Sequence, residues 1–355
     1  MVGDMSRSSS PLSLVRQQPA ALTDTRGRPL HDLRISVMDR CNFRCPYCMP
    51  ASKYGKDFAF LPSNERLDFD EIIRLTRLAT TLGVRKVRIT GGEPLLRPDL
   101  SELISELRRI EAIEDIALTT NGVLLGQFAP ALMAAGLTRA TVSLDSLDPK
   151  VFSIMNGGRG ELDRVLKGIR AAADAGLGKL KINTVVQRGV NDHTLLDMLE
   201  YFRGSDIVVR FIEYMDVGNL NHWSLDEVVP STDLLKTISQ RWPLEALPGN
   251  YHGEVAQRYR YADGAGEIGF ISSVSAPFCG SCTRARLSSD GSLYTCLFAE
   301  SGIDLKGPLR SDASDEQLLG LMRNAWSQRA DRYSEERATP AAVNHKKIEM
   351  YFIGG

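Results

Sequence analysis

Apolar and polar residues alternate from about Leu33 to Ile212 in a pattern that predicts repeated β/α units. Short runs rich in β-branched residues predict strands, and longer runs with apolar residues three and four positions apart predict helices. The expected strands are Leu33–Val37, Lys86–Thr90, Asp115–Thr120, Ala140–Leu144, Leu180–Val186 and Ile207–Ile212. The expected helices are residues 68–82, Leu100–Ile110, Gly126–Ala135, Leu162–Ala175 and His193–Phe202.

Strands and helices that alternate in this way predict a parallel sheet with right-handed crossovers. Six units are too few to close an eight-stranded barrel, so we expect an α/β fold, an open, partial six-stranded β/α barrel of the TIM type. A doubly wound nucleotide-binding sheet is an alternative that the strands alone do not exclude. Polar motifs follow the strands at Asp39–Met49, Gly91–Pro94, Asn121 and Asp145, and active sites of β/α barrels lie at that edge.

The pattern becomes irregular beyond Pro230, where Gly249–Gly269 is rich in turn-forming residues and a helix is expected over Asp315–Arg329. We therefore expect three regions: a flexible tail at residues 1–30, a barrel domain at 31–230, and a C-terminal extension at 231–355 that packs against the barrel. The first 30 residues are rich in Ser, Pro, Arg and Gln and lack the apolar segment of a signal peptide. Asp4 and Asp24 count against an organelle transit peptide.

Bulk composition narrows the classes of partner. The chain has 355 residues, 43% of them hydrophobic, and a formal net charge of −1. This balance gives no indication of a nucleic-acid or membrane-surface partner, and no run of apolar residues is long enough to cross a bilayer. We expect a cytoplasmic protein, in which an anionic ligand must be held by a local cluster of Lys and Arg.

All six cysteines fall into two groups of three, with the spacings C-x3-C-x2-C and C-x2-C-x13-C. Three thiolates leave one iron of a [4Fe–4S] cluster without a protein ligand, and that iron is free to bind a cofactor or substrate. Zinc with a distant fourth ligand is the alternative, His31 for the first group and His252 for the second. For the second group, a purely structural or electron-relay cluster is also open.

The first group and a glycine motif resemble the radical SAM superfamily, whose enzymes use S-adenosylmethionine (SAM). Its signature is C-x3-C-x-aromatic-C after a first strand, with Tyr47 here in the aromatic position. Its second motif matches Gly91–Pro94, where glycines let the backbone approach a ligand closely. The resemblance implies that SAM binds the open iron and that a reduced cluster cleaves it to a 5′-deoxyadenosyl radical.

From about Gly27 to Gly355 the chain resembles one family closely, the GTP 3′,8-cyclases, also called molybdenum-cofactor biosynthesis protein A. The most specific segments are Asp39–Cys45, Arg88–Pro94, Cys279–Leu287 and Ile353–Gly355. The resemblance implies a lyase that converts GTP to (8S)-3′,8-cyclo-7,8-dihydroguanosine 5′-triphosphate, in the first step of molybdenum cofactor biosynthesis. It also implies two [4Fe–4S] clusters, SAM, an electron donor, and cyclic pyranopterin monophosphate synthase as the next enzyme. Monomer and homodimer both stay open.

The same resemblance assigns roles to single positions. The implied cluster ligands are Cys41, Cys45 and Cys48 for the first cluster and Cys279, Cys282 and Cys296 for the second. The implied GTP-binding residues are Arg34, Arg88, Thr119, Lys181, Arg284, Ala285 (through its backbone) and Arg286, with Arg210 as a further candidate. The implied SAM-binding residues are Tyr47, Gly92, Ser143 and Met215. A triphosphate needs several cations, although each of these cations alone is equally compatible with a surface charge or a structural ion pair.

The terminal pair Gly354 and Gly355 is assigned a catalytic role by the resemblance. The preceding segment, Lys347–Ile353, is apolar and β-like. It predicts a docked strand that threads two residues without side chains into the barrel mouth beside the substrate. A frayed chain end is the alternative.

Two other functional classes remain open from the residues alone. One is a different radical SAM enzyme, such as a peptide-modifying enzyme with auxiliary clusters, which usually carries more C-terminal cysteines than the three found here. The other is a non-catalytic zinc protein that serves as a scaffold for a partner.

Overall fold

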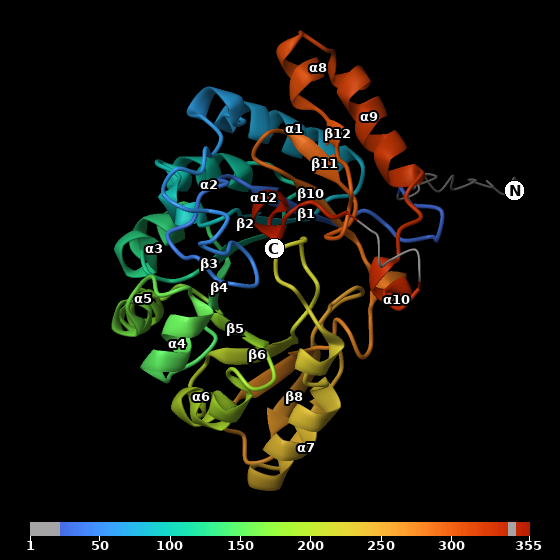
Figure 1. Ribbon diagram of the computed structural model, residues 1–355. Coiled ribbons are helices and arrows are strands. Elements are labelled where there is room, and N and C mark those ends of the chain that lie inside the picture. The colour runs from blue at the N-terminus through green and yellow to red at the C-terminus, as the bar shows by residue number, and fades with distance from the viewer. Residues whose placement is uncertain (1–21, 340–345) are drawn as a thin grey trace, which may run out of the picture.

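The computed structural model describes residues 22–339 and 346–355, and the predicted β/α alternation forms the centre of the molecule (Figure 1). All six predicted strands and five predicted helices of this region are present, with ends shifted only slightly. The strands are β1 Asp32–Ser36, β2 Lys86–Thr90, β3 Asp115–Thr120, β4 Arg139–Ser143, β5 Lys181–Val186 and β6 Val208–Glu213. The helices are α1 Phe69–Thr81, α2 Leu100–Arg108, α3 Leu125–Ala134, α4 Pro149–Met155, α5 Leu162–Asp174 and α6 Leu195–Phe202.

The start and end of α1 illustrate how the local sequence fixes an element. The Asp68 side chain accepts a hydrogen bond from the Glu71 amide, and the Glu71 side chain accepts one from the Asp68 amide, so the predicted capping box is present. Gly83 ends the helix with a φ of 116°, a conformation that L side chains rarely adopt. The pattern did not predict α4, whose N-cap Asp148 accepts hydrogen bonds from two backbone amides.

The C-terminal region adds strands to both edges of this sheet. Its strands are β7 Leu244–Leu247, β8 Gln257–Tyr261, β9 Glu267–Ile271, β10 Arg284–Leu287, β11 Ser292–Tyr294 and β12 Ile303–Asp304. Its helices are α7 Ser231–Arg241, α8 Lys306–Arg310, α9 Asp315–Ser327, α10 Tyr333–Glu336 and α12 Met350–Ile353. Short 3₁₀ turns occur in both regions: η1 Ser63–Glu65, η2 Pro94–Leu96, η3 Asp192–Thr194, η4 Leu225–Glu227 and η5 Cys279–Ser281. The helix predicted near Asp315 is therefore confirmed.

The strand order settles the architecture. Among the described residues the sheet runs β12-β11-β10-β1-β2-β3-β4-β5-β6-β9-β8-β7. Strands β1 to β6 follow one another without the reversal that defines a doubly wound sheet, and β12 and β7 form two free ends. The open, partial barrel is confirmed. Strands β10 and β9 extend its parallel part, because β10 pairs with β1 and β9 with β6 in the parallel sense.

The turn-rich range Gly249–Gly269 also contains strand β8 and the beginning of β9, which the pattern did not predict. Their sequences are short and interrupted by turn-forming residues, so the local pattern is weak. What makes them strands is pairing: β9 lies against β6, and β8 pairs antiparallel with β9. Such long-range pairing leaves little trace in a short window of sequence.

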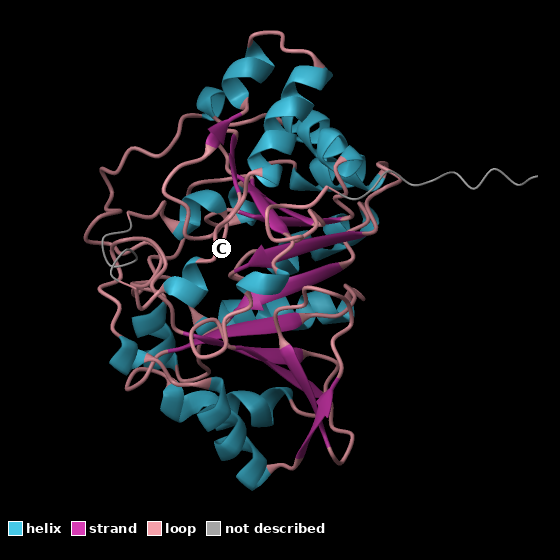
Figure 2. Ribbon diagram, turned by 90° about the vertical axis from the view of Figure 1, so that its right-hand side faces the viewer, coloured by secondary structure: helices cyan, strands magenta, loops and turns pink. Residues whose placement is uncertain are grey.

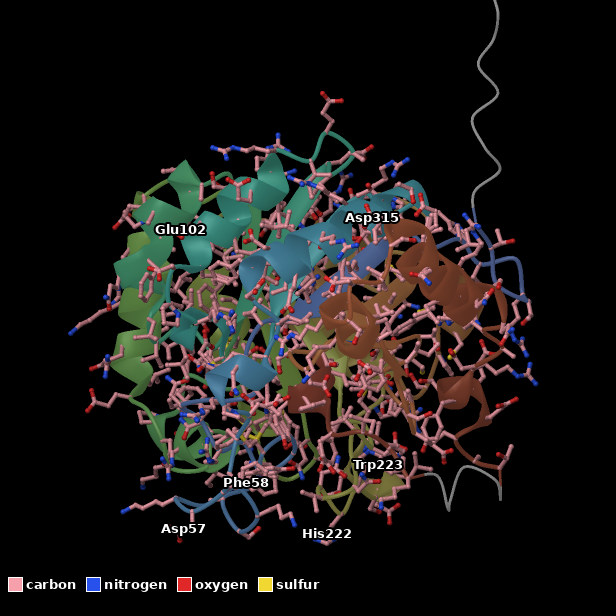
Figure 3. The ribbon with its side chains drawn as sticks, turned by 90° about the horizontal axis from the view of Figure 1, so that it is seen from above. Asp57, Phe58, Glu102, His222, Trp223 and Asp315 are labelled. Carbon is pink, nitrogen blue, oxygen red and sulfur yellow. The ribbon has the colours of Figure 1, made fainter. Side chains whose placement is uncertain are left out.

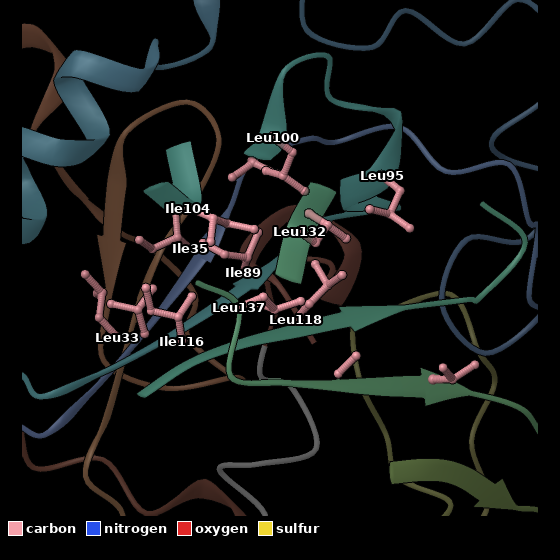
Figure 4. Packing of buried hydrophobic residues seen from close by; sticks show 14 of the residues in the cluster. Leu33, Ile35, Ile89, Leu95, Leu100, Ile104, Ile116, Leu118, Leu132 and Leu137 are labelled. Carbon is pink, nitrogen blue, oxygen red and sulfur yellow. The ribbon is translucent and has the colours of Figure 1, made fainter. Parts of the chain in front are cut away.

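Side chains of each strand alternate between a helix-covered outer face and a polar inner face. Leu33, Ile35 and Ile89 point outward and pack with Ile104 of α2 and Leu132 of α3 in the main core (Figure 4). The helices form the outer layer around the strands (Figure 2). The alternate residues of the same strands, which include several Arg and Thr, are left on the inner face.

The outer helical layer and the loops occupy different parts of the surface. Glu102 of α2 lies on the outer helical layer, while the loops that carry Phe58 and His222 lie together on another side (Figure 3). No helix within residues 22–339 or 346–355 combines the length and the apolar character that a membrane crossing requires.

The chain end at residues 22–30 departs from the expected flexible tail. Asp24 and Arg28 form a buried ion pair with a distance of 2.5 Å, and Arg28 Nη1 also donates to the carbonyl of Cys279 at 2.9 Å. Trp326 of α9 donates its indole N–H to the Arg28 carbonyl. The prediction is therefore wrong for residues 22–30, which pack on the C-terminal region, while residues 1–21 lie outside the described residues.

Candidate active site

The inner face of the barrel surrounds a cavity of about 330 Å³, and both cysteine groups line it. Each of the six cysteines contributes to its wall, and each is partly buried and unpaired by a disulfide. The C-terminus lies at the centre of the molecule, close to the ends of β1 and β2 (Figure 1). The two groups, which are more than two hundred residues apart in the chain, therefore belong to one site.

The loop that follows β1 carries Cys41, Cys45 and Cys48. A tight turn forms where the amide of Cys48 donates to the carbonyl of Cys45 at 3.0 Å. Arg44, between the first two cysteines, points away from the thiols and donates to three backbone carbonyls, those of Tyr54, Cys41 and Phe43. The cysteine spacing thus places three thiols at the cavity, and Arg44 stabilises the loop that carries them.

The charges around the first group oppose ionisation of its thiols. Burial and the neighbouring Glu93 carboxylate raise the pKa of Cys41 to about 12. Burial, Asp145 and the other two thiols raise the pKa of Cys45 well above its usual range. Three thiols that disfavour one another as thiolates need a strongly positive centre between them, which an iron–sulfur cluster supplies.

The glycines of Gly91–Pro94 let two loops meet. A Cβ on Gly92 would lie 2.2 Å from the carbonyl oxygen of Arg40, and one on Gly91 would lie 2.5 Å from that of Met38. The Glu93 amide donates to the Arg40 carbonyl at 2.8 Å. The motif therefore packs backbone against backbone beside the cysteine loop, and Gly92 also lines the cavity.

Glu93 itself is a buried link between this motif and the end of β3. Its carboxylate accepts hydrogen bonds from the Thr120 hydroxyl at 2.7 Å and from the Asn121 amide at 2.8 Å. Burial raises the pKa of Glu93 to about 7, although these donors partly oppose that shift. Asn121 in turn donates to the side chain of Asn42 in the cysteine loop.

The four predicted SAM positions all line the cavity: Tyr47, Gly92, Ser143 and Met215. The Tyr47 hydroxyl donates to Asp145 at 2.8 Å, and the Val185 amide donates to the other oxygen of that carboxylate at 2.9 Å. Burial raises the pKa of Asp145 to about 6 despite these two donors. This end of the cavity is thus lined by carboxyl groups and thiols.

The second cysteine group stands among arginines. Cys279 begins the short turn η5, Cys282 follows it, and Cys296 follows β11. The Cys282 sulfur accepts hydrogen bonds from Arg284 at 3.2 and 3.4 Å, and its carbonyl accepts one from Arg329 at 2.8 Å. Burial opposes ionisation of Cys282, but Arg284 and Arg329 outweigh it and lower the pKa to about 6.

Cations from neighbouring strands gather in the same cavity. In the sheet register, Arg34 of β1 stands beside Arg88 of β2 on one side and Arg286 of β10 on the other. Burial and these two neighbours hold the pKa of Arg34 well below its usual range. Arg88 donates to the Thr119 hydroxyl at 2.9 Å, so a neutral group is its hydrogen-bond partner there. Cations that repel one another in this way favour an anionic ligand.

Most of the predicted GTP positions reach the cavity wall. Its lining includes Arg34, Arg88, Thr119, Arg284 and Arg286, together with the further candidate Arg210. Lys181 lies half-buried near Arg210, and burial with that neighbour lowers its pKa to about 8. Neither Lys181 nor Ala285 belongs to the lining, and the Ala285 side chain is buried in the core on the outer face of β10.

The C-terminal segment enters the cavity, but as a helical turn. The expected strand over Lys347–Ile353 is wrong, because Met350–Ile353 forms α12. A single turn buries Tyr351 and Ile353 without needing a free sheet edge, which a strand would require. Gly355 lines the cavity, and the Gly354 carbonyl accepts a hydrogen bond from Arg286.

The conformation of Gly354 explains why glycine stands there. Its φ is 76°, and a Cβ would lie 2.3 Å from a methyl group of Thr90 in β2. A Cβ on Gly355 would meet only the side chain of Met350, at 2.8 Å. Gly354 is therefore the more constrained member of the pair.

The zinc alternatives gain no support from the geometry. His31 pairs with Asp32 at the beginning of β1, whereas the cysteine loop follows the end of that strand, and His252 is exposed in the β7–β8 loop. Within the described ranges, no three His, Cys, Asp or Glu side chains form a group that could hold a single metal ion. A four-iron cluster is larger than one ion, and its ligands stand farther apart.

Several cavity residues were not assigned as site residues from the sequence. Asn121 and Asp145 follow strands, and that position was the only signal for them, whereas Glu93 also lies within the Gly91–Pro94 motif. Lys86 and Tyr251 were missed because their contact joins distant segments: the Lys86 ammonium lies 2.7 Å from the Tyr251 hydroxyl at the beginning of β2.

Comparisons with known proteins identify the family of the chain. Residues 35–202 match the model of the Radical SAM superfamily, and residues 207–335 match that of Molybdenum Cofactor Synthesis C. The structure of Streptococcus suis SuiB aligns with a TM-score of 0.57 at 17% identity, covering 86% of this chain and 68% of that one, which supports the fold.

Curated relatives extend the match over nearly the whole chain. A GTP 3′,8-cyclase of Xanthomonas axonopodis pv. citri (strain 306) is 56% identical over 336 residues, covering 95% of this chain and 99% of the relative. A GTP 3′,8-cyclase of Staphylococcus carnosus (strain TM300) is 50% identical, covering 94% and 99%. At this identity and coverage, the chain belongs to the GTP 3′,8-cyclase family of the radical SAM superfamily.

Proposed function

We propose that this protein uses SAM and two [4Fe–4S] clusters to convert GTP to 3′,8-cyclo-7,8-dihydroguanosine 5′-triphosphate. The observation that carries the proposal is one cavity that is lined by the three thiols of each cysteine group and by a set of arginines. This lining provides thiols for two clusters, carboxyl groups for a cationic cofactor and arginines for a polyanionic substrate. The relatives named GTP 3′,8-cyclase support the choice of substrate.

The first group fits a cluster with SAM. Its three thiols leave one iron open, and the nearby Asp145 and Glu93 suit the cationic sulfonium and ammonium groups of SAM better than they suit a phosphate. When bound, a reduced [4Fe–4S] cluster and SAM together supply the radical that abstracts a hydrogen atom. Tyr47, held by Asp145, covers one side of this space and restricts the orientation of the cofactor.

The second group fits a cluster with GTP. Three thiols again leave one iron open for a nucleobase, and Arg284 and Arg286 project from β10 beside it. Arg34 of β1 and Arg88 of β2 then provide charges for the phosphates, and Lys181 of β5, outside the cavity lining, adds a further charge. Guanidinium groups bind phosphate oxygens in pairs, so these side chains fix the substrate in one orientation.

The chain's own contribution to the reaction is orientation and exclusion of water. Holding the ribose between the two sites brings its C3′ towards the cofactor and leaves C8 of the base as the nearest reaction partner. The C-terminal Gly354 and Gly355, fixed by Arg286, close the cavity beside the substrate. Closure keeps other hydrogen donors away from the reactive intermediate.

The reaction consumes one hydrogen atom from GTP and returns one electron and one proton to it, so product and substrate have the same mass. An external electron donor is therefore required. We expect the product to pass to cyclic pyranopterin monophosphate synthase.

The test is anaerobic incubation of the reconstituted protein with SAM, dithionite and GTP deuterated at C3′. We expect a new nucleotide that is isomeric with GTP, and deuterium in the 5′-deoxyadenosine that accompanies it. GTP deuterated at C2′ is the matched control and should transfer no deuterium. If 5′-deoxyadenosine forms without deuterium from C3′, the proposed hydrogen abstraction is excluded.

A further inference from the structure

A buried carboxylate outside the proposed cofactor and substrate contacts gathers three partners from distant parts of the chain. Asp216 follows Met215 in the connection after β6 and is 8% exposed. Its Oδ2 accepts hydrogen bonds from the Tyr333 hydroxyl at 2.5 Å and from Lys347 Nζ at 2.7 Å. Its Oδ1 accepts one from Arg337 Nε at 2.7 Å. Both oxygens are therefore used, one of them twice.

The charges make Asp216 the centre of this arrangement. Burial alone would favour the neutral acid, but Arg337 and Lys347 outweigh it and lower the pKa of Asp216. Both cations are themselves largely buried, with side chains 9% exposed. Removing the carboxylate would leave two buried cations facing each other, which is far more costly than losing a surface ion pair.

The same connection also forms hydrogen bonds with the backbone of the C-terminal segment. Asn219 accepts a hydrogen bond from the Lys347 amide at 3.0 Å and donates its side-chain amide to the Lys347 carbonyl at 2.5 Å. The Asn219 amide donates to the Glu349 carboxylate at 3.1 Å. A Cβ on Gly218 would collide with that carboxylate, at 2.1 Å. Residues Asp216–Asn219 thus form a clamp on Lys347–Glu349.

From this clamp the chain runs directly into the cavity. The Ile348 amide donates to the Ala299 carbonyl, and Met350 packs with Val217 and Phe298 in a small apolar cluster. One turn of α12 then leads to Gly354, whose carbonyl faces Arg286. Few residues separate the clamp from the cavity, so a shift of the clamp must move the terminal glycines.

We propose that Asp216 is a positioning residue, which anchors the C-terminal segment so that Gly354 and Gly355 reach the substrate side of the cavity. The proposal rests on the function proposed above. It also links two parts of the site, because Met215, the adjacent residue, lines the cavity at the predicted SAM position. The connection that follows β6 therefore contacts the cofactor side and the terminal segment at once.

The test uses the reconstituted holoprotein with Asp216→Asn, which keeps the shape of the side chain and removes its charge. We expect hydrogen exchange of the amides in Met350–Gly355 to become about tenfold faster or more, because the anchored state loses a buried charge pair. The turnover number should fall by a similar factor. Iron content and SAM affinity should stay at the wild-type values, since neither site loses a ligand.

Matched variants separate anchoring from general damage. Asp226→Asn changes an exposed carboxylate of η4 in the same connection and should alter neither exchange nor turnover. Asp216→Glu keeps the charge and should restore part of both. Asn219→Ala removes two side-chain contacts to Lys347 from an exposed position, so it should fold normally and accelerate exchange of the same amides.

Three outcomes decide against the proposal. Wild-type exchange and turnover in Asp216→Asn would show that the carboxylate anchors nothing. Faster exchange with full turnover would show that the anchored segment is not needed, and lost turnover with unchanged exchange would place the role elsewhere. If Asp216→Asn loses its iron, Asn219→Ala decides by the same criteria. If the wild type makes no cyclic nucleotide, the proposed function fails, while the exchange measurements still test the anchor.

Discussion

Cys45 and Cys282 are the middle members of two three-cysteine groups that line one cavity, and their neighbours have opposite charges. Around Cys45 stand Asp145 and the other two thiols, and its pKa is raised well above its usual range. Around Cys282 stand Arg284 and Arg329, and its pKa is lowered to about 6. Both thiols are buried, so the difference comes from the neighbouring charges.

This contrast supports the ligand that we propose for each group. A cavity end with carboxyl groups, where no arginine of the described residues donates a hydrogen bond to the thiols, favours a cationic ligand such as a sulfonium compound. An end with several guanidinium groups favours a polyphosphate. In the proposed function, two three-cysteine groups with different spacings each hold a cluster, and the charges around them separate cofactor from substrate.

The largest expected effect comes from removing a thiol of the first group. Cys45→Ser leaves the first cluster without one of its three ligands, so 5′-deoxyadenosine formation should fall to background. The measurement is anaerobic turnover with SAM and dithionite, with iron content recorded for each sample. Wild-type SAM cleavage by this variant would contradict the assignment of the first group.

Cys282→Ser should disrupt the second cluster site and leave the first cluster site intact. We expect loss of GTP binding and of cyclic product, because the open iron that holds the base is missing. SAM should still bind with wild-type affinity, measured by equilibrium dialysis under nitrogen. If a protein that lacks the second cluster binds GTP with unchanged affinity, the open iron of that cluster does not bind the substrate.

Changes to the terminal glycines should affect product more than binding. Gly354→Ala should reduce cyclic product strongly, because the new Cβ collides with Thr90 and the backbone is unfavourable for alanine. Gly355→Ala should reduce it less, since the neighbouring Met350 side chain can move. Iron content serves as the control, and full turnover by a chain truncated after Ile353 would refute a role for the pair.

Replacing Arg284 and Arg286 by Ala tests the cationic side of the contrast. Each charge-assisted hydrogen bond in a desolvated site contributes about 1.5–3 kcal/mol, so GTP affinity should fall about tenfold or more for each arginine. SAM affinity and iron content should not change. A loss of iron that accompanies the loss of affinity in every preparation would instead indicate a structural role.

The smallest expected effect is a pH dependence from Lys181. Burial and Arg210 lower its pKa to about 8, so the free protein loses this charge as the pH rises through that value. A triphosphate prefers the protonated amine, so GTP affinity should be constant below about pH 7 and fall by up to about tenfold per pH unit above pH 8. Lys181→Met should bind GTP more weakly and show a flatter profile over the same range.

The regular part of the barrel could be predicted because it depends on local pattern. The alternation in Leu33, Arg34 and Ile35 specifies a strand with one apolar face, and Asp68 with Glu71 specifies a helix start. The prediction failed where pairing decides the structure. Strand β9 exists because β6 offers an edge, and α12 forms where the sequence looked β-like because a turn fits the space beside Thr90.

The sequence by itself determined the two cysteine groups, the glycine loop and the order of the β/α units, since each is a matter of neighbouring residues. The family resemblance added the site residues. Only the tertiary structure brought both groups into one cavity, aligned Arg34, Arg88 and Arg286 across three strands, and placed Asp216 against Lys347. These contacts join residues far apart in the chain, and their energies depend on burial and on charges supplied by other strands, which no local pattern encodes.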